Sequence, residues 1–382
     1  MPKYRFDEIA INSTEKKKPV EADKDTYIGL EHLDSGCLEV TRWGAEVAPV
    51  GDKLVMHKGD VLFGRRRAYQ KKVSIAPFDG IFSAHGMVLR PIESVITKEF
   101  FPFFISSDYF LDAAIKISVG SLSPTINWRD LAKLEFQIPS LDEQASLSSV
   151  LWAMNRLKMA YTDLLQQADA LVQSQFVEMF EGTERAFPEC SIMEACTDKD
   201  DIKCGPFGTQ LKQSEYTHSG VPVWGIPEIN SEFKKEPEIF VTTEKAEQLS
   251  QFSLIPGDIA MSRKGNVGQC AIYPESFQPG IIASDVLRIR ADRKRIVPRF
   301  MQYQLHYSEN VRNQILQVSN GAVMAGINVT KLKAITVFTP PLELQEDFVK
   351  LVEQTDKSKL AIRQALESLE KSRNTIMKSI FG

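Results

Sequence analysis

The chain has 382 residues, of which 43% are hydrophobic and 25% charged, with a net charge of −4 at pH 7. This length predicts two or more globular domains, and no apolar run approaches the eighteen or so residues that cross a bilayer. The charged start, MPKYRFDEIA, does not resemble a secretory signal, so we expect a cytoplasmic protein with no membrane partner. The five cysteines are scattered without zinc-site spacing, so no metal site is expected.

The first stretch, residues 1–140, is expected to form an α+β unit of short strands and loops. GDVLF (59–63) is typical of a buried strand leaving a Gly-Asp turn, and GIFSAHGMVLR (80–90) indicates a second strand. A helix is indicated within Thr97 to Lys116, which is rich in Phe.

A long helix is predicted next, from Leu141 to Phe180, after Pro139. Neither Gly nor Pro interrupts it, and forty residues span roughly 60 Å. Its apolar residues recur at steps of three and four, which predicts a single apolar seam made of Leu147, Val150, Met154, Leu157, Tyr161, Leu164, Ala168 and Leu171. The net negative charge of the chain arises in this helix and its tail, residues 141–187.

The same order then returns about 200 residues later, which indicates a tandem duplication. GDIAM (257–261), GIIASDVLRIR (280–290) and GAVMAGIN (321–328) correspond to GDVLF, GIFSAHGMVLR and GSLSPTIN (120–127), and a helix is indicated in Pro298 to Leu316. A second forty-residue helix, Leu342 to Phe381, carries a seam through Phe348, Val352, Thr355, Ile362, Leu366, Leu369, Ile376 and Ile380. Each seam needs a partner, so we predict that the two long helices pair as an antiparallel coiled coil.

No catalytic motif is visible: the chain has no phosphate-binding loop, no HExxH and no nucleophile elbow. Binding is therefore favoured over catalysis. The strongest binding candidates are basic turns at equivalent places in the two copies, with Arg65, Arg66, Arg67, Lys71 and Lys72 in the first and Arg263 and Lys264 in the second. Arginine-rich turns suit contacts with DNA phosphates and guanine edges, whereas the alternative is a solvated basic loop.

Three further features are weaker candidates. GPFGTQLK (205–212) places Phe207 between two glycines and adds Lys212, which suits close approach to a ligand or a plain tight turn. Asn127 and Asn328 occupy one repeat position, where an Asn either reads adenine or fixes the local backbone. A basic run, Arg288 to Arg299, is interrupted only by Asp292 among charged residues and is favoured as a surface turn leading into a helix.

Two globular parts, each with GDxxxxR inside it and each ending in IN…PxLxxQ before a long helix, resemble the DNA-specificity subunit of type I restriction-modification enzymes. The resemblance covers essentially the whole chain, and PSLDEQ (139–144) matches the usual start of the helix more closely than PPLELQ (340–345), where Leu344 replaces an acidic residue. It implies an α+β fold with target-recognition domains at 1–140 and 183–340 and spacer helices at 141–182 and 341–382. The candidate residues would then bind double-stranded DNA.

The resemblance also implies that the chain is not an enzyme. Methylation would be performed by two DNA-adenine methyltransferase subunits, and cleavage by motor-nuclease subunits in the restricting complex. S-adenosylmethionine, ATP and Mg would accordingly belong to those partners, and this chain would hold no cofactor. The helices would keep the two recognition domains at a fixed separation, so that each reads half of a split target.

Two alternatives stay open. One is the recognition part of another split-site restriction system, in which the methyltransferase and the nuclease are fused. The other, from a different class, is a coiled-coil adaptor that binds only protein.

Overall fold

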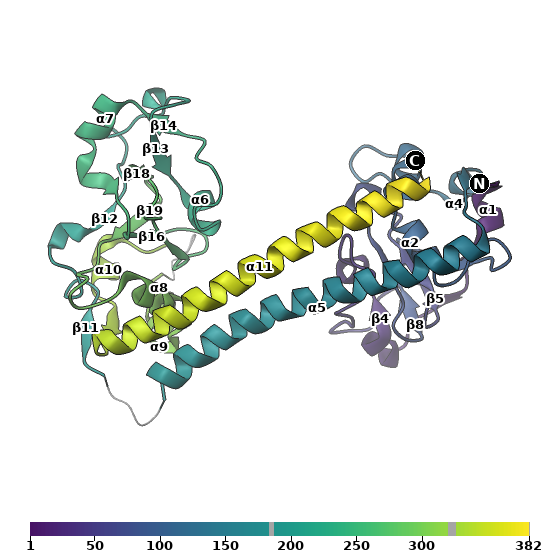
Figure 1. Ribbon diagram of the computed structural model, residues 1–382, viewed down its shortest axis with the longest axis horizontal. Coiled ribbons are helices and arrows are strands. Elements are labelled where there is room, and N and C mark those ends of the chain that lie inside the picture. Colours follow the sequence, from purple (N-terminus) through teal and green to yellow (C-terminus); the bar gives the residue numbers. More distant parts are fainter. Residues whose placement is uncertain (183–186, 320–325, 382) are drawn as a thin grey trace. The chain divides into compact units, whose positions relative to one another are not determined.

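The computed structural model describes residues 1–182, 187–319 and 326–381 (Figure 1). The chain forms two compact units: the first unit comprises Met1–Thr162 and Arg363–Gly382, and the second unit comprises Asp163–Ile362. Each unit therefore includes part of both long helices. The expected boundary between residues 182 and 183 borders residues 183–186, which lie outside the described residues, and it stays a prediction. No helix in the described ranges has the length and apolar character of a membrane span.

The first unit contains three small sheets with helices packed on them. The four-stranded sheet β2-β9-β6-β7 is formed by Ala10–Ser13, Met87–Pro91, Val61–Phe63 and Val73–Ile75. The sheet β3-β5-β8-β4 is formed by Lys16–Lys17, Lys53–Met56, Gly80–Phe82 and Tyr27–Ile28, and the pair β1-β10 by Lys3–Arg5 and Glu135–Gln137. The α-helices are α1 (Phe6–Ile9), α2 (Phe101–Ile105), α3 (Asp108–Lys116) and α4 (Trp128–Leu131).

The second unit repeats this topology. The sheet β12-β19-β16-β17 is formed by Ile202–Cys204, Val286–Ile289, Ile259–Ser262 and Cys270–Ile272. The sheet β14-β13-β18-β15 is formed by Phe240–Val241, Val221–Trp224, Gly280–Ile282 and Ser253–Leu254. The pair β11-β20 is formed by Glu189–Ser191 and Thr336–Phe338. Its α-helices are α6 (Ile226–Asn230), α7 (Thr243–Gln248), α8 (Pro298–Tyr307), α9 (Glu309–Ser319) and α10 (Val329–Lys333). The parallel pair β4–β8 has its counterpart in β13–β18, which confirms the duplication.

The prediction of one strand at 80–90 and of one strand at 280–290 is wrong in the same way in both copies. The stretches 80–90 and 280–290 each form two strands in different sheets, because a turn intervenes in which Gly86 N–H donates to Ser83 O and Val286 N–H donates to Ala283 O. The helical signal within 97–116 is confirmed and forms two helices, because the Ser107 side chain caps the start of α3. Ser308 similarly separates α8 from α9.

Both long helices span the predicted residues, α5 from Leu141 to Phe180 and α11 from Leu342 to Phe381. In the first unit, Leu151 of α5 shares a buried apolar cluster with Met377 and Ile380 of α11. In the second unit, the pairing joins the other ends, where the Phe176 and Phe348 rings lie 5.6 Å apart. The start of each helix therefore meets the end of the other, as an antiparallel pair requires (Figure 1).

The predicted seam of α5 is only partly right. Its members Val150, Leu157, Leu164 and Leu171, seven residues apart, are 42% to 50% exposed. The helix instead buries Leu151 and Val172, which lie on a neighbouring stripe with the same spacing. Periodicity alone does not choose between two such stripes, since packing against the globular part sets the rotation of the helix. The predicted seam of α11 is confirmed, because all of its members are buried or partly buried.

A buried glutamine fastens each long helix to the globular part that precedes it. The Gln144 side-chain oxygen accepts the Thr97 N–H at 2.7 Å, and its NH2 group donates to Val95 O and Pro139 O at 2.9 Å each. Gln345 repeats this pattern, accepting from Val297 N–H and donating to Arg295 O and Pro340 O. Both glutamines are completely buried. One amide thus satisfies a donor and two acceptors of otherwise unpaired loop backbone.

Replacing Gln144 by Leu should destabilise the first unit by about 2–4 kcal/mol, because a buried N–H and two buried carbonyls lose their partner. Gln345→Leu should do the same to the second unit. Urea unfolding of the full chain, with hydrogen exchange to locate the loss, measures both. Gln166→Leu on the exposed side of α5 is the matched control and should change stability by less than about 0.5 kcal/mol. Equal effects at Gln144 and Gln166 would contradict the role assigned to the buried amide.

Candidate nucleic-acid interface

The basic turn of the first unit follows β6 and is held by backbone hydrogen bonds to residues 124–126. Arg65 O accepts from Ile126 N–H at 3.0 Å, and Arg67 N–H donates to Pro124 O at 2.8 Å. The Arg66 and Arg67 side chains are exposed. Arg66 Nε donates to Ser123 Oγ at 3.0 Å, and the Arg66 side chain stays exposed. Two arginines are therefore presented on a turn with a fixed backbone.

Arg65 and His85 support this turn. Arg65 is partly buried and donates to Ala84 O at 3.3 Å, while its Nε is buried without a hydrogen-bond partner. His85 Nε2 lies 3.4 Å from Arg66 Nη1. Partial burial, together with the positive charges of Arg66 and Arg65, lowers the pKa of His85. The ring is therefore neutral at pH 7 and adds no charge to the turn.

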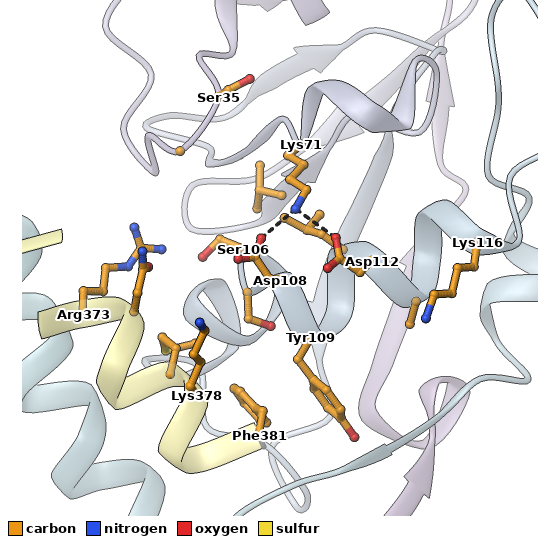
Figure 2. A pocket seen from close by; sticks show the side chains of 17 residues that line it. Ser35, Lys71, Ser106, Asp108, Tyr109, Asp112, Lys116, Arg373, Lys378 and Phe381 are labelled. Atoms are coloured by element: carbon orange, nitrogen blue, oxygen red, sulfur yellow. Dashed lines mark hydrogen bonds and ion pairs between the residues drawn. The ribbon is translucent and has the colours of Figure 1, made fainter. Parts of the chain in front are cut away.

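The two lysines of the cluster are engaged within the fold. Lys71 Nζ lies 2.7 Å from Asp108 and 2.9 Å from Asp112, two carboxylates of α3 (Figure 2). Lys72 Nζ donates to Leu30 O at 2.6 Å. The sequence places both lysines beside the arginines, but the structure turns their ammonium groups toward acceptors of the protein itself. Their contribution to binding DNA stays a prediction, and the geometry favours a structural role.

The second unit builds its turn with the same backbone pattern. Arg263 O accepts from Ile327 N–H at 3.0 Å, as Arg65 O does from Ile126. Arg263 Nη1 lies 3.4 Å from Ser284 O, the equivalent of the Arg65 contact with Ala84, and its Nε is likewise buried without a partner. Lys264, which follows it, is exposed. The equivalence suggested by the repeat alignment is therefore confirmed in geometry.

The structure brings a second candidate segment to this turn. The Arg263 guanidinium lies over the Phe207 ring, 5.1 Å from its centroid, and Arg263 Nη1 is 3.1 Å from Cys204 Sγ. Phe207 is half exposed, and the loop turns at Gly208, whose φ is +51°. Lys212, farther along the loop, is also exposed. An exposed ring held beside an arginine offers a stacking surface for a base.

The two repeated asparagines mark helix starts. The Asn328 side chain accepts the Lys331 N–H at 2.9 Å and so caps α10. Asn127 stands at the same place before α4, but its side chain makes no capping hydrogen bond and it is exposed. The backbone-fixing interpretation holds for Asn328, and Asn127 is the freer of the two side chains to meet a ligand.

The basic run from Arg288 to Arg299 is mostly structural. Arg288 is 3% exposed and donates to backbone carbonyls, and Arg299 pairs with Asp356 of α11 at 2.6 Å. Arg290 forms a two-pronged ion pair with Asp258, both oxygens at 2.8 Å. The predicted surface turn is thus wrong for Arg288, which is buried, although helix α8 does follow the run.

Sequence reasoning missed the role of the Asp in each Gly-Asp turn. Asp60 accepts two hydrogen bonds from Arg90, at 2.8 and 2.9 Å, and one from His57 N–H. Asp258 does the same with Arg290 and Ile255 N–H. The signal was present, because the GD and the LR or IR that ends the later strand recur together in both copies. These arginines clamp the strands that carry the exposed basic turns.

A comparison of the sequence with known protein families identifies the family of this chain. The model of the type I restriction modification DNA specificity domain matches residues 11–164 and 205–371, most of the chain. The two matches place one copy of the domain on each half of the duplication. The chain therefore belongs to the family of type I restriction-modification DNA specificity proteins.

Individual relatives are distant. The chain is 24% identical over 184 residues to the type I restriction enzyme EcoDI specificity subunit of Escherichia coli, covering 47% of this chain and 41% of that protein. It is 22% identical over 327 residues to the StySPI specificity subunit of Salmonella potsdam, covering 81% and 68%. A putative specificity subunit, MjaX of Methanocaldococcus jannaschii, is 30% identical over 149 residues, covering 37% and 34%. The chain thus spans less than half the length of the EcoDI and MjaX proteins.

Solved structures agree in fold over the full chain. The type I restriction-modification S subunit from M. genitalium has a TM-score of 0.58 at 15% identity, covering 100% of this chain and 96% of that one. A chain from a study of complex assembly in the type I R-M system has a TM-score of 0.60 at 19% identity, covering 100% and 97%. At these identities the likeness establishes the fold alone.

Replacing Arg90 by Met should destabilise the first unit by about 3 kcal/mol, because Asp60 would keep a buried charge without its partner. The matched control is Arg42→Met, which breaks an equally two-pronged pair with Asp34 on the surface. That change should be worth about 1 kcal/mol or less. Thermal and urea unfolding of both variants measures the difference. Similar losses in the two would show that the Asp60–Arg90 pair is not a structural clamp.

Proposed function

We propose that this chain is the sequence-specific DNA-binding subunit of a type I restriction-modification complex and reads a bipartite, asymmetric target. The observation that carries the proposal is the pair of equivalent basic turns, each on one copy of a duplicated specificity domain. Arg66 and Arg67 in the first unit and Lys264 in the second are exposed on backbones fixed by matching hydrogen bonds. Preorganised cations of this kind suit phosphate contacts and the edges of bases in a groove.

The chemistry in this proposal is done by other subunits. Two DNA-adenine methyltransferase subunits would supply S-adenosylmethionine and flip the target adenine. Motor-nuclease subunits of the restricting complex would use ATP and Mg. The present chain would select the DNA without being an enzyme, hold no cofactor of its own, and work in the cytoplasm, where its DNA is.

The exposed stripe of α5 supports docking of a partner helix. Val150, Leu157, Leu164 and Leu171 recur every seven residues, so they form an exposed stripe next to the one that holds Leu151 and Val172. Four half-exposed apolar side chains in heptad spacing form a ready coiled-coil seam. A helix of a methyltransferase subunit is the occupant we propose. A coiled-coil adaptor that binds only protein would use the same stripe. A measurement of whether the complex selects a DNA sequence distinguishes this adaptor from a DNA-binding subunit.

Removing the exposed cations of one unit should weaken recognition of one half of the target. The target is first determined by mapping methylated adenines in DNA from cells that express the complete system. The double variant Arg66→Ala with Arg67→Ala should then remove footprint protection from one half-site. It should also reduce the slope of the logarithm of the binding constant against the logarithm of the salt concentration by about two, which corresponds to the loss of about two phosphate contacts. Arg263→Ala with Lys264→Ala should affect the other half-site.

Lys58→Ala is the matched control, because Lys58 is exposed but precedes β6, whereas Arg66 follows it. It should leave both half-sites protected. If both double variants keep full affinity and protection at moderate salt, these turns are not the DNA contacts. If the wild-type complex selects no DNA sequence at all, the adaptor function is favoured instead.

Lengthening both long helices should change the unread spacer of the target. Seven residues inserted between Thr162 and Asp163, and seven between Ile362 and Arg363, keep the heptad register and add about 10 Å to each helix. These positions are where the chain passes from one compact unit to the other. Because B-DNA rises about 3.4 Å per base pair, the preferred spacer should lengthen by about three base pairs. Methylation mapping reads the spacer directly, and an unchanged spacer would rule out a ruler role.

A further inference from the structure

A small closed loop of the first unit lies directly against the basic turn. Val119 and Thr125 exchange two backbone hydrogen bonds, of 3.0 and 2.9 Å, which close the loop formed by residues 120–124. Gly120 has a φ of +116°, a conformation that an L side chain rarely adopts. The Thr125 hydroxyl donates to Ser123 O at 3.1 Å. These constraints fix the loop in one conformation.

The loop is tied to both exposed arginines. Arg66 Nε donates to Ser123 Oγ at 3.0 Å, and Arg67 N–H donates to Pro124 O at 2.8 Å. Arg66 and Thr125 also pair as an isolated antiparallel bridge. The tip of the loop is therefore held at a fixed position relative to the two cations.

An unpartnered apolar side chain stands at that tip. Leu122 is 94% exposed, and Val119 at the base of the loop is 65% exposed. A single exposed leucine is ordinary on a protein surface. Here, however, the backbone that carries it is fixed on both sides, and the neighbouring side chains are positively charged. An apolar tip flanked by arginines matches duplex DNA, in which anionic strands flank apolar base faces.

The second copy has a comparable residue in its sequence. Gly321 aligns with Gly120, and Val323 aligns with Leu122, each pair 201 positions apart. Residues 320–325 lie outside the described residues, so the comparison is of sequence alone. An apolar residue nevertheless occurs at this position in both copies.

We propose that Leu122 is a specificity-determining residue that inserts as an apolar wedge at a base step of the half-site read by the first unit. Arg66 and Arg67 hold the flanking phosphates, so that the wedge meets the bases at a fixed position. The sequence dependence arises because base steps differ in how easily they unstack. This inference rests on the proposed function and names a residue and a contact that the proposed function leaves open.

The test uses the full chain assembled with its methyltransferase subunits and DNA that carries the mapped target. Three variants are compared with wild type: Leu122→Ser, the conservative Leu122→Met, and Val20→Ser as a control on an exposed residue of the same unit. Affinity is measured for the target and for a random duplex at one salt concentration. A second readout is the fluorescence of 2-aminopurine placed in turn at each step of the first half-site, which rises when a base unstacks.

We expect Leu122→Ser to bind the target 10- to 100-fold more weakly and to keep its affinity for random DNA. Apart from the signal at the flipped adenine, which every assembled variant should show, the 2-aminopurine signal should rise at one further step with wild type and Leu122→Met, and not with Leu122→Ser. Val20→Ser should behave as wild type. Melting curves check that each variant is folded, which the exposure of Leu122 leads us to expect.

Three outcomes would overturn the wedge. If Leu122→Ser matches wild type in both readouts while wild type still selects its target, Leu122 is not a wedge and the proposed function remains intact. If Leu122→Ser loses affinity for the target but assembles normally and leaves every 2-aminopurine signal unchanged, Leu122 contacts the DNA without unstacking a base. Failure of Leu122→Ser to assemble with the methyltransferase subunits would show that the loop binds protein. A wild-type complex that selects no sequence would instead refute the proposed function itself.

Discussion

The structure depends on how a long helix is fixed to the globular part before it. A primary amide is one of the few neutral side chains that donates and accepts at once, and Gln144 and Gln345 use both capacities in a fully buried site. The first turn of the helix tolerates more change. Ser140 and Glu143 form a capping box at the start of α5, whereas Leu344 at the start of α11 packs against the core instead. The glutamine, and not the cap, is what the two copies share.

Much of the architecture could be predicted from the sequence because the tandem duplication repeats each sequence pattern. The two long helices were predicted to their terminal residues, and the order of segments in each globular part was clear. The rotation of α5 was not predictable, since Val150 and Leu151 begin two adjacent stripes with equal spacing. Contacts with the globular part, including that of Gln144, choose between them. The turns within 80–90 and 280–290 were missed because their apolar flanks read as one continuous strand.

The candidate site was likewise only partly predictable from the sequence. Counting cations identified the basic turns, but it treated Lys71, Lys72 and Arg66 alike. The acceptors of Lys71 and Lys72 are two carboxylates and a backbone carbonyl that are distant in sequence, which no local pattern reveals. The structure separates arginines and lysines that hold the fold from those that face solvent. It also shows that the exposed ones follow strands clamped by the Asp60–Arg90 and Asp258–Arg290 pairs, whose carboxylates are buried. The rigidity of the turn and its charge therefore come from different residues.

The antiparallel pairing has a consequence for the order in which the protein is made. The core of the first unit includes Met377 and Ile380, and the Phe381 ring stacks on Tyr109 at 4.9 Å. The ribosome supplies these residues more than two hundred positions after Phe104 of α2 and Tyr109 of α3, against which the Phe381 ring packs. Until then the aromatic cluster of the first unit stays open on one side, so the first unit to be synthesised is completed last. A chain interrupted within α11 leaves apolar surface exposed, which is the signal by which cells recognise and remove unfinished proteins.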